Sequence, residues 1–110
     1  MIKFETEGNT EIVSFGTDTI NALISEEIKE KINTRVESGI SRLIVDLEGV
    51  RYIDSSGFGC LLSVARSAKS NYCTVKYCSI TPEVLKVLEL LHLHTVFSIY
   101  PDRDSCLAAF

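Results

Sequence analysis

The sequence predicts an α/β fold in which helices cover a mixed sheet. Alternating residues over 2–7 are typical of a half-buried strand, because successive side chains of a strand point to opposite faces. The turn signal Gly8-Asn9 and the strand-like segment over 11–15 then predict a hairpin. The nearly continuous apolar run over 43–47 is typical of a central strand covered on both faces. Helical patterns alternate with the later strands, which predicts a sheet with helices packed over it.

A first helix is expected after the hairpin. Asp18 or Thr19 can cap its start, because both side chains accept hydrogen bonds from free amides. The helix is expected to reach about Ser38, and Gly39 to end it. Apolar residues spaced three and four positions apart are expected to form its inner stripe: Ile20, Leu23, Ile24, Ile28, Ile32 and Val36.

A second helix is expected to follow the strand over 43–47. A short connection leads to Asp54, whose carboxylate can cap the helix. The helix is expected to run to about Ser70, and Asn71 closes it. One side carries its larger apolar residues: Phe58, Leu61, Leu62, Ala65 and Ala68.

The remaining pattern predicts strand, helix, strand and a short helix. The segment over 73–80 is rich in strand formers. Thr81 can cap a third helix, with Pro82 in the first turn where proline is tolerated. The last strand is expected over 95–100 and a terminal helix over 102–110. The inner stripe of the third helix is expected to be Val84, Leu85, Leu88 and Leu91.

Length and charge restrict the functional class. The 110 residues fit one domain, 1–110. The net charge is -4 and no Lys/Arg cluster is present, which argues against binding nucleic acid or an anionic membrane. The sequence has neither the apolar stretch of a signal peptide nor a run long enough to insert into a membrane. We therefore expect a cytoplasmic protein.

Cysteine and histidine do not indicate a cofactor site. None of the four cysteines forms a C-x-x-C pair, and Cys73 and Cys78 are expected on opposite faces of a strand. We expect reduced, mostly buried thiols. His92 and His94 do not by themselves indicate a metal site, which would need further ligands such as carboxylates close to them. No metal, cofactor or catalytic residue is therefore predicted.

The segment over 54–59 breaks local rules. Gly57 and Gly59 disfavour a helix by about 1 kcal/mol each relative to alanine, yet they follow a good cap. Glycine would let another backbone approach closely, and two serines lie at the positive end of the helix dipole, where a phosphate is favoured. Three interpretations compete: tight helix–sheet packing, a phosphorylatable helix start that faces a partner, and a nucleophilic serine. The nucleophile lacks both a nearby base in the sequence and the Gly-x-Ser-x-Gly elbow.

A family resemblance favours the second interpretation. The stretch over 45–59, which ends in Asp-Ser-Ser-Gly-Phe-Gly, resembles the core of the STAS domain. The resemblance continues through 75–84 to Val96-Phe97. This domain is typical of bacterial anti-sigma factor antagonists, also called anti-anti-sigma factors. The resemblance implies the STAS fold: a mixed four- to five-stranded sheet with helices mainly on one face.

The resemblance also implies a mechanism. The unphosphorylated protein binds an anti-sigma factor, a serine kinase of the histidine-kinase-like ATPase superfamily, and so frees a sigma factor. The kinase phosphorylates the first serine of the motif, here Ser55, and the complex then dissociates. A metal-dependent phosphatase of the PP2C type resets the switch. We expect Asp54 to hold Ser55 outward and Ser56 to turn toward free amides.

The resemblance implies a partner surface around this serine. The early Gly-x-Leu-Asp signature of the family is only partly kept, since its glycine is out of register and Asp18 is the best match to its aspartate. The expected partner-binding residues are Asp18, Asn21, Asp54, Ser55, Ser56, Gly57 and Phe58. Two other roles stay open: a soluble STAS subunit of a lipid-transporting ABC system, and a serine hydrolase, which would be an enzyme. STAS domains also occur as tails of anion transporters, but the length of the chain argues against that role.

Overall fold

The structure is a computed structural model that describes residues 1–110. It contains two short strands, β3 and β5, in addition to the predicted elements, whose order it confirms. The elements are β1 (Ile2–Glu7), β2 (Thr10–Phe15), β3 (Thr19–Ile20), α1 (Ala22–Glu37), β4 (Arg42–Asp46), β5 (Tyr52–Ile53), α2 (Ser55–Ser70), β6 (Thr74–Cys78), α3 (Pro82–Leu90), β7 (Ile99–Tyr100) and α4 (Arg103–Ala108).

Five strands form a mixed sheet in the order β1-β2-β4-β6-β7. β1 is antiparallel to β2, and the other neighbours are parallel. Val13, Val45 and Tyr77 lie side by side across the middle of the sheet. The central strand β4 is buried on both faces, as its apolar run predicts.

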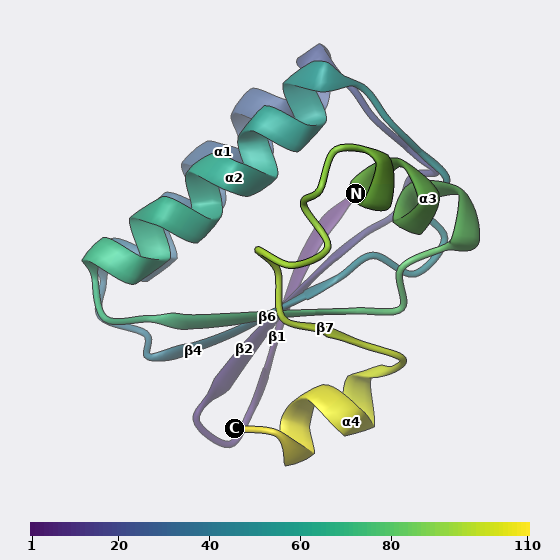
Figure 1. Cartoon of the computed structure of the whole chain (residues 1–110). Helices are drawn as coiled ribbons and strands as arrows, with labels where there is room; N and C mark the ends of the chain where they lie inside the picture. The colour runs from purple at the N-terminus through teal and green to yellow at the C-terminus, as the bar shows by residue number, and fades with distance from the viewer.

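Helices lie mainly on one face of the sheet, which confirms the predicted STAS fold class (Figure 1). α1, α2 and α3 cover the main core, whereas α4 covers a small cluster on the opposite face. Cys73 belongs to the first cluster and Cys78 to the second, so the two thiols lie on opposite faces as predicted. All four cysteines are buried and unpaired.

The start of α1 differs from the prediction. The cap is Asn21 rather than Asp18 or Thr19, and its side-chain oxygen accepts hydrogen bonds from the amides of Leu23 and Ile24 at 3.0 and 3.4 Å. Ile20 belongs to β3, which pairs with β5. Leu23 is not part of the buried stripe, which follows every fourth residue from Ile24 to Val36 and leaves Leu23 90% exposed.

The segment after α3 is less regular than predicted. Thr81 caps α3 as expected, with Pro82 in its first turn. The predicted strand over 95–100 is limited to β7, because the amides of Val96 and Phe97 bond to the carbonyl of Leu93 in a turn. This turn places Phe97 in the core and leaves Leu91, expected on the inner stripe, half exposed.

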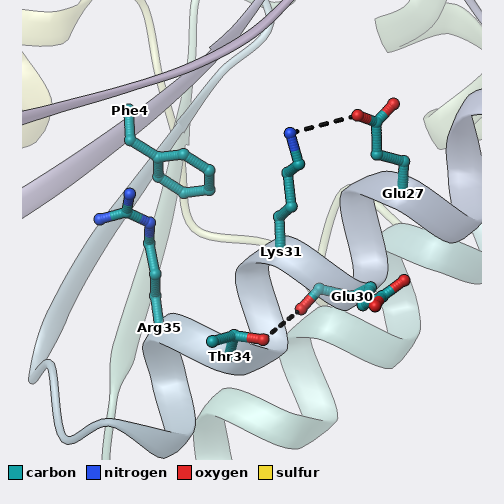
Figure 2. A pocket seen from close by; sticks show the side chains of 6 residues that line it. All are labelled: Phe4, Glu27, Glu30, Lys31, Thr34 and Arg35. Carbon is teal, nitrogen blue, oxygen red and sulfur yellow. Dashed lines mark hydrogen bonds and ion pairs between the residues drawn. The ribbon is translucent and has the colours of Figure 1, made fainter.

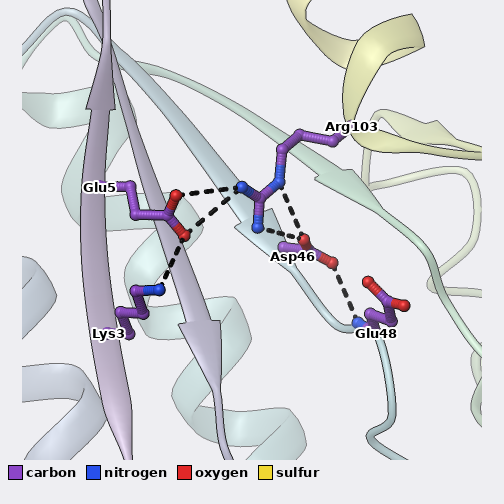
Figure 3. A network of polar contacts seen from close by, with 5 residues as sticks. All are labelled: Lys3, Glu5, Asp46, Glu48 and Arg103. Atoms are coloured by element: carbon purple, nitrogen blue, oxygen red, sulfur yellow. Dashed lines mark hydrogen bonds and ion pairs between the residues drawn. The ribbon is translucent and has the colours of Figure 1, made fainter.

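An ion-pair network fastens α4 to the sheet (Figure 3). Arg103, the first residue of α4, donates from Nε and Nη2 to Oδ2 of Asp46 at 3.1 and 2.8 Å. It also contacts Glu5 of β1 at 3.4 Å. Asp46 is nearly fully buried at the end of β4 and also accepts from the amide of Glu48. The guanidinium of Arg103 thus balances the negative charge of the buried Asp46 carboxylate.

Candidate functional site

The first turn of α2 is positioned by the small β3–β5 ladder. The carbonyl of Asp18 accepts hydrogen bonds from the amides of Arg51 and Tyr52 at 2.8 and 3.0 Å. The amide of Asp54 donates to the carbonyl of Ile20 at 3.2 Å. These bonds hold the segments that lead into α1 and α2 side by side, so that both helices begin at the same end of the molecule.

Asp54 and Ser55 form the exposed helix start. Oδ1 of Asp54 accepts from the amide of Gly57 at 2.9 Å, which confirms the predicted cap. Ser55 is the first residue of α2 and is exposed, and no protein group is hydrogen-bonded to its hydroxyl. Ser56 is also exposed and does not bond the free amides of the helix start, so the predicted inward turn of Ser56 is wrong. The amide of Gly57 already donates its hydrogen bond to the carboxylate of Asp54.

Gly57 serves the protein's own packing. A Cβ at this position would lie 2.5 Å from Cγ2 of Ile53 and 2.9 Å from the carbonyl oxygen of Ile20. The backbone that approaches closely therefore belongs to β3. Gly57 is buried, and its contact with a partner stays a prediction. At Gly59 a Cβ would meet nothing within 4 Å, although this residue lies in the same helix.

The two glycines allow a matched test of this packing. We expect Gly57→Ala to destabilise the protein by about 2 kcal/mol, because the added methyl forces β3 and β5 away from α2. Gly59→Ala should stabilise it by about 0.5–1 kcal/mol through helix propensity alone. Urea unfolding of both variants gives the comparison, and equal effects would contradict the assigned role of Gly57.

A groove of about 340 Å³ lies beside the helix start, between β5 and α3. It brings together three predicted site residues, Asn21, Asp54 and Phe58, although Phe58 is only 7% exposed and contributes to the floor. No signal in the sequence marks the other lining residues as part of a site, among them Thr19, Arg51, Tyr52, Glu83 and Val87. Exposed apolar surface is present here, since Tyr52 is 59% exposed and Val87 37%.

Polar contacts hold the rim of this groove together. Arg51 and Glu83 form an exposed ion pair with Nε and Nη2 each 2.9 Å from Oε2. The pKa of Glu83 is lowered by its own backbone amide and then by Arg51, and the hydrogen bond to Glu83 raises the pKa of Arg51. The hydroxyl of Thr81 donates to the carbonyl of Val50 at 2.8 Å. α3 is therefore tied to the segment that precedes Ser55.

A second groove of about 380 Å³ runs between the first turns of α1 and α2, where Ser56 and Lys29 line it. Its only thiol, Cys60, donates to the carbonyl of Ser25 at 3.3 Å. Burial raises the pKa of Cys60 to about 11, so the thiol is protonated and unreactive near neutral pH. Cys60 is therefore not an activated nucleophile.

The exposed predicted residues thus share one end of the molecule. Asp18, Asp54, Ser55 and Ser56 are exposed there, and Asn21 is half-buried. Neither histidine lines the grooves beside Ser55. A free hydroxyl next to a capping carboxylate and an apolar groove is suited to partner contact and modification. Contact of these residues with a partner stays a prediction. None of the helices combines the length and apolar composition that crossing a bilayer requires.

Comparison with known proteins finds relatives over most of the chain. Residues 2–106 match the family model described as the STAS domain. BtrV of Bordetella bronchiseptica, named as an anti-sigma factor antagonist, is 26% identical over 91 residues, which cover 83% of this chain and 78% of BtrV.

Solved structures share the fold. An anti-sigma-factor antagonist (STAS) domain protein from Planctomyces limnophilus superposes with a TM-score of 0.87 at 22% identity, covering 98% of this chain and 95% of that one. The anti-sigma factor antagonist SpoIIAA in its unphosphorylated form has a TM-score of 0.78 at 22% identity, covering 96% and 92% of the two chains. The phosphorylated form of SpoIIAA, a Bacillus cell fate determinant, has a TM-score of 0.75 at 20% identity and covers both chains fully.

Proposed function

This chain belongs to the STAS domain family, and from that premise we propose that it is an anti-sigma factor antagonist switched by phosphorylation of Ser55. The observation that carries the proposal is the exposed, unbonded hydroxyl of Ser55 at the start of α2. A kinase can reach this hydroxyl without unfolding any element. The proposed role is regulatory binding in the cytoplasm rather than catalysis.

The proposed cycle has two states. Unphosphorylated, the chain binds an anti-sigma factor serine kinase of the histidine-kinase-like ATPase superfamily and releases a sigma factor. Phosphorylated on Ser55, it dissociates, and a PP2C-type phosphatase restores it. The names of the relatives support this cycle, as does SpoIIAA, which shares the fold and has been solved in both forms.

The surface around Ser55 suits this cycle. Tyr52 and Val87 offer apolar area beside the helix start, and Leu23 projects from the first turn of α1. Tyrosine is enriched among the residues that carry most of the binding energy of protein interfaces, and surrounding apolar contacts exclude water. Asp18 and Asp54 add negative charge on the same surface. A phosphate at Ser55 would increase that charge and oppose docking, whereas the helix dipole would tolerate it within the free protein.

Phosphate transfer tests the proposal. The purified chain is incubated with ATP and each of a panel of anti-sigma factor kinases, and phosphate is located by mass spectrometry. We expect one phosphate on Ser55 in the wild type and in Ser56→Ala, and none in Ser55→Ala. Transfer that persists in Ser55→Ala would move the switch elsewhere, and a kinase that binds the chain without modifying it would contradict the cycle.

A further inference from the structure

Strand β1 leaves one edge of the five-stranded sheet unpaired. At its start the amide of Gly16 donates to the carbonyl of Met1 at 2.8 Å. Bonded pairs alternate along an antiparallel ladder, so the backbones that face β2 are those of Lys3, Glu5 and Glu7. The backbone groups that face outward are those of Ile2, Phe4 and Thr6.

β1 has neither the bulge nor the proline that would prevent further pairing, and its charged side chains are Lys3, Glu5 and Glu7. Its register with β2 is continuous over six residues. Its outer edge opens onto a groove of about 500 Å³ between Phe4 and α1 (Figure 2). The guanidinium of Arg35 lies 3.8 Å from the centre of the Phe4 ring, and Lys31 projects along the same groove. The groove has room for side chains of an added strand.

We propose that β1 pairs antiparallel with β1 of a second copy of this chain, about a two-fold axis at Phe4. In this arrangement Lys3 lies opposite Glu5 of the second copy, and Glu5 lies opposite its Lys3. The two charged pairs occupy positions without a direct backbone bond, where facing side chains are closest. Lys3 and Glu5 already approach within 3.8 Å along the strand, so both lie on one face of the sheet.

Charge and backbone direction select this register over its neighbours. An axis at Lys3 would place that lysine against itself, and an axis at Glu5 would place two glutamates together. An axis at Thr6 would oppose Glu5 and Glu7. The axis at Phe4 has no like-charge pair, and its outward backbone groups meet those of the second copy in hydrogen bonds. The edge is therefore complementary to itself.

Sedimentation equilibrium from micromolar to millimolar concentration tests the pairing. We expect the mass to rise from 12.2 kDa toward twice that value. Lys3→Glu should weaken the dimer by about tenfold or more, because two attractive pairs become repulsive. Lys86→Glu makes the same charge change on the exposed face of α3 and should leave the dimer unchanged. Added salt should weaken the wild-type dimer.

Mixing supplies a test of the register. Lys3→Glu and Glu5→Lys should each dimerise weakly alone. An equal mixture should form a heterodimer at concentrations where neither variant dimerises, since both glutamates of the first variant then face lysines of the second. Circular dichroism verifies folding. If Glu5→Lys does not fold, dimer affinity must fall from wild type through Lys3→Gln to Lys3→Glu. A chain that stays monomeric, a dimer indifferent to Lys3→Glu, or folded variants that do not associate on mixing would overturn the proposal.

Discussion

Replacement of Ser55 by aspartate is expected to weaken binding of the anti-sigma factor kinase by about two to four orders of magnitude. A charge buried at an interface without a counter-charge costs several kcal/mol, and each 1.4 kcal/mol is about tenfold in affinity. Asp54 adds like-charge repulsion at the adjacent position. The fold should be unaffected, because the new carboxylate lies at the positive end of the α2 dipole, where it is worth about 0.3–1 kcal/mol.

Calorimetry and thermal unfolding separate these two effects. Ser55→Asn is the matched control, because asparagine has the size of aspartate without its charge and is expected to retain most of the affinity. Ser55→Asp should bind weakly while its melting temperature stays at or slightly above that of the wild type. Affinity within threefold of the wild type would show that charge at this position does not control docking.

Removal of Arg103 is expected to produce the largest loss of stability, about 3 kcal/mol. Arg103→Ala leaves Asp46 charged and nearly inaccessible, with the amide of Glu48 as its remaining partner (Figure 3). Breaking a buried pair from one side costs about 3–5 kcal/mol. The lower end applies because the Arg103 side chain is 32% exposed and therefore partly screened by solvent. α4 should detach or fray in this variant.

Urea unfolding measures this loss, and two further variants locate its cause. Asp46→Asn combined with Arg103→Ala should recover much of the stability, because the uncompensated buried charge is gone. Arg51→Ala removes the exposed pair with Glu83 and should leave the stability nearly unchanged, because solvent screens that pair. Equally small losses of unfolding free energy in Arg103→Ala and Arg51→Ala would show that the Arg103 network does not stabilise the fold.

Local sequence rules were sufficient for most of the scaffold. The cap at Asp54, the cap at Thr81 and the buried run of β4 depend on residues adjacent in the chain, and the structure confirms all three. The same rules misplaced the start of α1. Asp18, Thr19 and Asn21 are all suitable caps by residue type. The choice of Asn21 depends on β3, which pairs with a strand some thirty residues later.

The candidate site also combines features that neighbouring residues predict with features that depend on tertiary packing. The motif and its serine could be predicted, but the groove beside it could not, because Tyr52 and Val87 are brought together by α3 packing against β5. No local signal marks an apolar residue that stays exposed, which is also why Leu23 was misassigned. The role of Gly57 depends on the distance to the backbone of Ile20.

The sequence by itself determined the order of the helices and of the five strands of the main sheet, the capped start of α2 and the position of Ser55 directly after the cap. Periodicity and capping act between neighbours along the chain, so they can be read before folding. Only the tertiary structure decided which glycine is needed for packing, which apolar side chains stay exposed, and that Arg103 neutralises Asp46. Those outcomes depend on distances between residues remote in sequence, which exist only once the sheet has formed.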